Sequence, residues 1–168
     1  TSKEIVHADQ WKEKDPARED AFRRARARNP RVVLAEARSA LDRGRQAARR
    51  GDYGGTGAPL AAALDKSTLD STAYLRPENL DYAARLRSYG YTAVFVRNPG
   101  LRPIDGVTLT GGGNNFVLLY TDAARSHELF HILELAGDAD ALSLRDAVDL
   151  SAEEAVGYGE ALARRGFS

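Results

Sequence analysis

The sequence predicts one α+β domain, in which a small, mainly antiparallel sheet leads directly into a buried helix and further helices precede the sheet. Three observations support this fold class. Residues 91–97, 106–110 and 116–121 are rich in β-branched and aromatic residues and are separated by segments that contain Gly and Asn. Residues 122–137 carry apolar side chains around most of a helix. The length of 168 residues suits a single domain, 1–168, with a substantial core.

The N-terminal part of the chain, residues 1–57, is expected to be helical and basic. A helix is predicted over residues 17–27, where Pro16 suits the first turn, and another over residues 32–49, which carry a broad apolar face. Residues 11–50 hold thirteen Lys and Arg against six Asp and Glu, although the whole chain has zero net charge. We expect a solvated basic face that packs on the core of the domain. The alternative is a footprint for nucleic acid or an anionic membrane surface.

The remaining residues, 58–168, are predicted to form the core and to carry the functional site. Residues 58–76 are rich in Ala, Ser and Thr, which favours one short helix and a loop, and a helix is predicted over residues 78–88. The three predicted strands follow, with a turn at residues 98–100 and a hairpin loop at residues 111–114. The sheet therefore leads straight into the helix that comes next.

Composition excludes several kinds of site. Because the chain has no cysteine, it can have neither a disulfide nor a thiolate metal ligand nor a cysteine nucleophile. Any metal must then be bound by His and carboxylate. No stretch approaches the roughly 20 apolar residues of a membrane span, so we expect a soluble protein. The sequence contains no methionine, which favours a domain taken from a longer polypeptide.

A metal-binding motif, HExxH, stands at His127-Glu128-Leu129-Phe130-His131. Residues four apart on a helix lie one above the other, so His127 and His131 can bind one zinc ion from adjacent turns. Glu128 follows the first histidine and can take a proton from a zinc-bound water, whose pKa zinc lowers to roughly 7. The motif therefore predicts a zinc site with a general base.

The sequence around the motif favours a buried helix. Asp122 can cap its start, and Gly137 stands where a left-handed C-terminal residue would end it. Only His127, His131 and Glu134 form a polar stripe, and one metal would give both buried imidazoles a partner. The alternative is a pair of core histidines bonded to backbone or carboxylates, or a chance motif on an exposed helix.

The third metal ligand must come from a later part of the chain. Glu134 lies roughly 10 Å along the helix axis from His127, so it can at most support a ligand, and an ordinary exposed glutamate is the alternative. A third histidine six residues after the second is ruled out, because glycine occupies that position. The candidates are Glu153 and Glu154, on a helix predicted after residue 150.

Glu153 is the favoured third ligand. Ser151 and Glu154 have the spacing of a capping box, which gives Glu154 a structural role, whereas Glu153 borders the apolar face of that helix. Tyr158 is a candidate hydrogen-bond donor to a tetrahedral oxyanion, and a packing or surface tyrosine is the alternative. Four carboxylates in the expected link between the two helices are weaker ligand candidates: Asp138, Asp140, Asp146 and Asp149.

These residues resemble a known family. The run HELFHILELAG, followed by Glu153 and Glu154 and then by Gly157-Tyr158-Gly159, is similar to the NleD-like effector metallopeptidases, which resemble gluzincins with HExxH and a downstream glutamate. The resemblance covers roughly the last third of the chain. It implies a minimal zincin-like fold, a Zn²⁺ cofactor, and a toxin or effector that is secreted or delivered into a target cell. A delivery apparatus and a cognate inhibitor are the further partners it suggests.

We therefore expect a zinc metallopeptidase, an endopeptidase that hydrolyses peptide bonds of a protein substrate. The motif histidines and either Glu153 or Glu154 bind the metal, and Glu128 activates the water and then protonates the leaving amine. In zincins an edge strand beside the motif helix commonly pairs with the extended substrate, but the sequence does not say which strand. Two alternatives stay open: a zinc-containing binding module without catalysis, and a basic nucleic-acid-binding toxin domain with an incidental motif.

Overall fold

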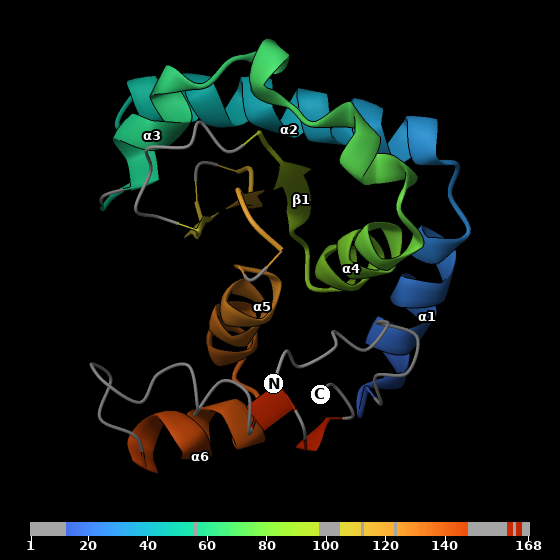
Figure 1. Cartoon of the computed structure of the whole chain (residues 1–168). Helices are drawn as coiled ribbons and strands as arrows, with labels where there is room; N and C mark the ends of the chain where they lie inside the picture. The colour runs from blue at the N-terminus through green and yellow to red at the C-terminus, as the bar shows by residue number, and fades with distance from the viewer. Residues whose placement is uncertain are drawn as a thin grey trace.

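A three-stranded sheet with the order β1-β3-β2 lies at the centre of the fold, with helices on both of its faces (Figure 1). The computed structural model describes residues 13–55, 57–97, 105–111, 113–122, 124–147, 161–162 and 164–165. The predicted α+β class is confirmed. Among the described helices, none combines the length and the apolar character that crossing a bilayer requires.

The sheet is mixed, so the prediction of a mainly antiparallel sheet is wrong. Strand β3 (Phe116–Leu119) runs parallel to β1 (Thr92–Phe95) and antiparallel to β2 (Gly106–Leu109). All four residues of β3 are apolar and buried, which suits the central position, whereas β2 alternates small polar and apolar residues and takes an edge. The antiparallel pairing of β2 with β3 agrees with the predicted hairpin between the last two strands.

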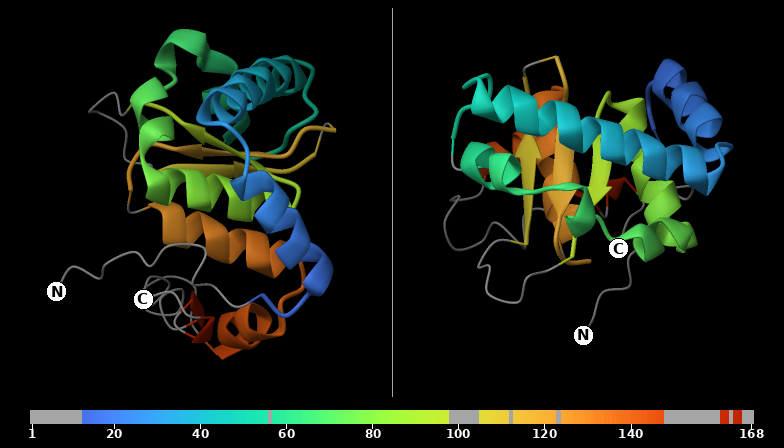
Figure 2. Two further views of the ribbon diagram at one scale, coloured as in Figure 1. Left: turned by 90° about the vertical axis from the view of Figure 1, so that its right-hand side faces the viewer. Right: turned by 90° about the horizontal axis from the view of Figure 1, so that it is seen from above.

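Two pairs of helices cover the two faces of the sheet, as the left view of Figure 2 shows. Helices α2 (Pro30–Arg49) and α3 (Gly57–Ala63) lie over one face, and α4 (Pro77–Ser88) and α5 (Ala124–Leu135) lie over the other. Helix α6 (Ala139–Ala147) lies beyond α5. The sheet therefore has no described face that is open to solvent, and a site must lie at an edge.

The N-terminal helices pack on the core, as the sequence predicted. Helix α1 (Pro16–Arg26) lies along α4, where the fully buried Arg85 binds Glu19 at 3.1 Å and stacks over the ring of Phe22. Helices α1 and α2 both begin with proline. The side chain of Asp15 caps α1, and the side chain of Asn29 caps α2. Two short 3₁₀ helices, η2 (Lys66–Thr68) and η3 (Ser71–Leu75), occupy the segment expected to be a loop.

Helix α5 ends where the sequence predicted. Gly137 adopts φ +77°, a left-handed conformation that costs glycine little, and its N–H donates to the carbonyl of Glu134. Helix α6 was not predicted, because its residues were assigned to a link. The Asp138 side chain accepts a hydrogen bond from the N–H of Ala141 at 3.1 Å, so this aspartate caps α6.

Candidate functional site

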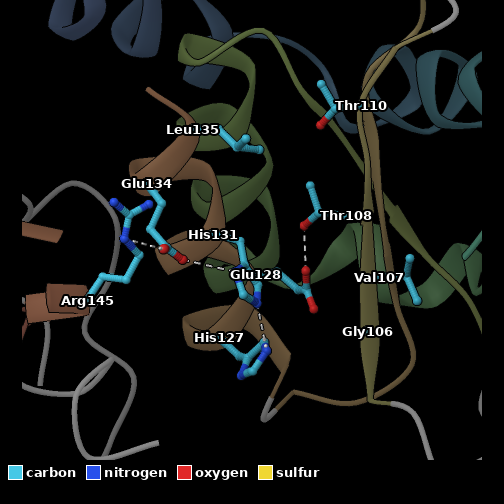
Figure 3. Close-up of a pocket in the computed structure, with 10 residues that line it drawn as sticks. All are labelled: Gly106, Val107, Thr108, Thr110, His127, Glu128, His131, Glu134, Leu135 and Arg145. Atoms are coloured by element: carbon cyan, nitrogen blue, oxygen red, sulfur yellow. Dashed lines mark hydrogen bonds and ion pairs between the residues drawn. The ribbon is translucent and has the colours of Figure 1, made fainter. Parts of the chain in front are cut away.

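Helix α5 presents the HExxH motif to an open cavity of about 560 Å³ (Figure 3). Strand β2 forms the opposite wall, and α6 contributes one side chain to it. The motif residues His127, Glu128 and His131 all line the cavity, as do Thr108 of β2 and Arg145 of α6. The structure thus brings the three motif residues together around one space.

The two motif histidines face each other. Their Nε2 atoms are 3.0 Å apart, and the ring centroids are 4.7 Å apart. Two imidazole lone pairs repel at this distance unless a proton or a cation lies between them. Two nitrogen ligands of one tetrahedral zinc ion, with Zn–N distances of about 2.0–2.1 Å, would lie about 3.3 Å apart. The observed separation therefore fits either an N–H···N hydrogen bond or a shared metal with a small adjustment.

A carboxylate lies behind His131. The Oε1 atom of Glu134 is 3.1 Å from Nδ1 of His131, and its Oε2 atom is 3.9 Å from Nε of Arg145. Because a carboxylate accepts hydrogen bonds, it favours the His131 tautomer that carries its proton on Nδ1. This tautomer leaves the Nε2 lone pair of His131 directed towards His127, where a metal or a donated proton can use it.

The carboxylate of Glu128 lies against strand β2. The residue is 3% exposed, and its Oε2 atom accepts a hydrogen bond from the hydroxyl of Thr108. The close approach depends on Gly106, because a Cβ at that position would lie 2.9 Å from Cβ of Ala124 and 3.1 Å from Cγ of Glu128. A glycine at the start of β2 therefore lets α5 bring the carboxylate to the cavity wall.

The opposite side of α5 is fixed to α4 through buried polar contacts. The guanidinium of Arg125 donates to Asn79, and the hydroxyl of Tyr82 donates to the carbonyl of Arg125 at 2.9 Å. Burial, and then the charge of Glu128, raise the pKa of Tyr82 well above its usual value. Burial lowers the pKa of Arg125, an effect opposed by Asp122. Tyr82 thus stays a neutral donor and holds the motif helix in place.

The described part of the chain supplies two imidazoles for a metal and no complete ligand set. No group of three or more His, Asp or Glu side chains in it could hold a metal ion. The predicted third-ligand candidates Glu153 and Glu154, the predicted oxyanion donor Tyr158 and the weaker candidate Asp149 lie outside the described residues. Two facing imidazoles with a carboxylate behind one of them are also common among the histidine ligands of metal sites.

The weaker aspartate candidates have other partners. Asp138 caps α6, and Asp140 binds Lys14 at 3.3 Å. Asp146 belongs to α6, but its side chain lies outside the described residues. Neither Asp138 nor Asp140 is among the described residues that line the cavity.

Several cavity residues were missed from the sequence, among them Gly106, Thr108, Thr110 and Arg145. The alternation of Gly106, Thr108 and Thr110 with apolar residues in the predicted strand was a usable signal, since alternate residues of a strand share a face. Arg145 had no such signal, because its helix was not recognised.

Comparison with known proteins does not assign a family. No protein-family model matches the chain, and neither the curated proteins nor the solved structures compared with it include a significant match. The resemblance of the motif region to the NleD-like metallopeptidases therefore stays a prediction.

Proposed function

We propose that this chain is a zinc-dependent endopeptidase with a minimal zincin-like arrangement of sheet and motif helix. The observation that carries the proposal is the 3.0 Å separation of the Nε2 atoms of His127 and His131, beside a cavity that Glu128 also lines. Helix spacing alone brings the two imidazoles together, so the added support is the open cavity that both histidines and Glu128 line. The resemblance of the motif region adds the proposal that the domain acts as an effector delivered into a target cell.

The motif residues have separate roles in the proposed reaction. His127 and His131 hold the metal with one carboxylate, for which Glu153 and Glu154 remain the candidates. Zinc, when bound, supplies a Lewis acid that makes water reactive near neutral pH. Glu128 accepts the proton of the attacking water and returns it to the leaving amine. The Thr108 hydroxyl, which donates to Glu128, orients that carboxylate towards the cavity.

Among the described strands, β2 has no neighbour on its outer side, and this edge suits an extended polypeptide substrate. The N–H of Tyr120 donates to the carbonyl of Asp105 at 2.9 Å, so alternate residues of this antiparallel pair, Gly106 and Thr108, direct their backbone groups away from β3. Both residues line the cavity. An extended peptide could therefore add as a further strand beside Glu128, with its peptide bonds held by main-chain hydrogen bonds.

Two measurements test the proposal. Elemental analysis of the purified chain should find about one zinc per molecule, lost in His127→Ala and in His131→Ala. Glu128→Gln should keep the zinc and lower the cleavage of an unstructured protein substrate by roughly 10²- to 10⁴-fold, the usual contribution of a general base. Glu36→Gln is the control, because Glu36 lies on α2 and pairs with Arg87 far from the motif. A zinc-free wild-type chain, or a Glu128→Gln variant as active as wild type, would refute the proposal.

A zinc-containing module without catalysis is the second candidate. The observation that favours it is the burial of Glu128, which is 3% exposed and already bonded to Thr108. In that case Glu128→Gln would change no activity, while His127→Ala would unfold the chain. For the nucleic-acid alternative we find less support, because Arg23, Arg26 and Arg28 of the basic stretch bind carboxylates of the same chain. Binding to DNA or RNA that weakens steeply with salt, in a chain without bound metal, would instead support the nucleic-acid alternative.

A further inference from the structure

Glu134 stands between a motif histidine and an arginine from another helix. Figure 3 shows the row that runs from Arg145 of α6 through Glu134 to His131 and then to His127. The contacts are 3.9 Å from Arg145 Nε to Oε2, 3.1 Å from Oε1 to Nδ1 of His131, and 3.0 Å between the two Nε2 atoms. The side chain of Glu134 is 15% exposed, against 44% for Arg145.

The geometry makes the effect of Glu134 on His131 directional. A carboxylate at Nδ1 can only accept, so the imidazole must carry its proton there and keep the Nε2 lone pair for the cavity. Such a carboxylate also makes the imidazole a better electron donor and fixes the orientation of the ring. A largely buried carboxylate needs a positive neighbour to stay charged. Arg145 lies near Oε2 of Glu134, whereas His131 contacts Oε1.

We propose that Glu134 and Arg145 are positioning residues that set the tautomer of His131 and thereby its affinity for zinc. Arg145 acts through Glu134 and not by touching the metal or the substrate. Because Arg145 belongs to α6, the placement of that helix becomes part of the metal site. This inference rests on the proposed zinc-dependent function and adds a support shell that the motif itself does not contain.

The first test measures zinc affinity in the chain stripped of metal, by competition with a chromophoric chelator. Glu134→Ala should weaken binding about 10- to 100-fold, which is the usual cost of removing such a support. Arg145→Ala should weaken it roughly 3- to 10-fold, and the double variant should bind no more weakly than Glu134→Ala alone, since the two residues act in series. Glu134→Gln, which keeps the size and an acceptor oxygen, should fall between wild type and Glu134→Ala.

Arg87→Ala is the matched control for the arginine. Arg87 is 49% exposed and binds Glu36 at 3.0 Å, so it resembles Arg145 in exposure and in its partner but lies away from the cavity. Its removal should leave zinc affinity unchanged. If Arg145→Ala behaves like Arg87→Ala, or if the effects of Glu134→Ala and Arg145→Ala add in the double variant, the proposed series is wrong.

The second test reads the tautomer without metal. Long-range proton–nitrogen spectra of the metal-free chain should show His131 protonated on Nδ1 and His127 protonated on Nε2, and Glu134→Ala should shift His131 towards the Nε2 form. A structural contribution of Glu134 alone would leave the tautomer as it is. A wild-type His131 protonated on Nε2 would overturn the inference even if the chain binds zinc. A chain that binds no zinc but shows the expected tautomers would refute both the enzyme proposal and the effect on zinc affinity, and only the hold of Glu134 on the tautomer of His131 would remain.

Discussion

The two outer edges of the sheet are treated differently. Along β1 the outward backbone groups are already bonded: the Tyr74 hydroxyl donates to the carbonyl of Ala93 at 2.8 Å and accepts from the N–H of Phe95 at 2.9 Å. The carbonyl of Phe95 accepts in turn from the N–H of Asp70 at 2.9 Å. The outer edge of β1 is therefore covered by the segment that contains η2 and η3. The Tyr74 hydroxyl makes the hydrogen bonds that a neighbouring strand would otherwise make.

Along β2 the corresponding groups face the cavity. Within the described ranges, no backbone partner lies on the outward side of Gly106 and Thr108. Unpaired edges can take up a further strand, so this edge, as far as the described residues show, is the one that the proposed peptide substrate would use. The contrast separates residues that hold the sheet from residues that serve the site.

Among substitutions along the two sheet edges, the largest expected effect comes from closing the gap beside β2. Gly106→Val would place methyl groups where Ala124 and Glu128 already lie, so α5 must move away from the strand. A displacement of about 1 Å at a catalytic group can lower the rate roughly 100-fold. We expect a loss of that size in kcat/KM for peptide cleavage, measured on folded protein.

Gly54→Val is the control for that substitution. A Cβ at Gly54 would meet no atom within 4 Å, and the residue lies in the loop before α3. Its activity should match wild type. Equal activity of the two variants would show that the contact between Gly106 and α5 has no part in the function.

The sequence could predict the elements of the fold that depend on local signals, but not the features that depend on packing between distant residues. Most helices and all three strands follow from local signals, such as proline at the first turn of α1 and the apolar run of β3. The direction of β1 relative to β3 is set by non-local pairing, which the alternation of residues within one strand does not encode. Helix α6 was missed because its residues were assigned to a link between two helices, and the capping role of Asp138 was not recognised.

The site divides in the same way. His127 and His131 lie on one helix, so their spacing alone was enough to predict that their rings meet. Thr108 and Arg145 reach the cavity from β2 and α6, and only the packing of these elements on α5 brings them there. Gly106 illustrates the limit best: its role comes from the distance to another element, which no local pattern reports.

The closed edge should matter for stability and not for the site. Tyr74→Phe removes the hydroxyl that serves Ala93 and Phe95 and leaves two buried backbone groups without it. We expect a loss of about 2–3 kcal/mol in the free energy of unfolding, measured by urea denaturation, with zinc content unchanged. Tyr91→Phe, which removes a hydroxyl bonded to that of Thr110, should cost less. If both variants lost the same stability, the bridging role of Tyr74 would be wrong.

The buried tyrosines also predict an alkaline weakness. Burial raises the pKa of Tyr74 and of Tyr82, so in the folded chain both stay neutral above the unfolded pKa of about 10. Above about pH 10 the unfolded chain loses these phenolic protons while the folded chain keeps them. The free energy of unfolding is therefore unaffected by them below about pH 10 and falls by about 1.4 kcal/mol per pH unit for each tyrosine as pH rises towards the folded pKa. Denaturation at pH 9 to 11 measures this slope. Tyr74→Phe should make it shallower, and an unchanged slope would contradict the assignment.

The smallest effect should come from a single hydroxyl on the open edge. Thr108→Val keeps the shape of the side chain but removes the donor to Glu128, so the carboxylate loses one constraint on its orientation. We expect kcat to fall roughly 3- to 10-fold with zinc content and KM unchanged, and Thr108→Ser to restore it. Thr110→Val is the matched control, because Thr110 lines the same cavity but its hydroxyl bonds to Tyr91 at 2.8 Å. If the two valine variants lost equal activity, the loss would reflect the polarity of the cavity wall and not the hold of Thr108 on the base.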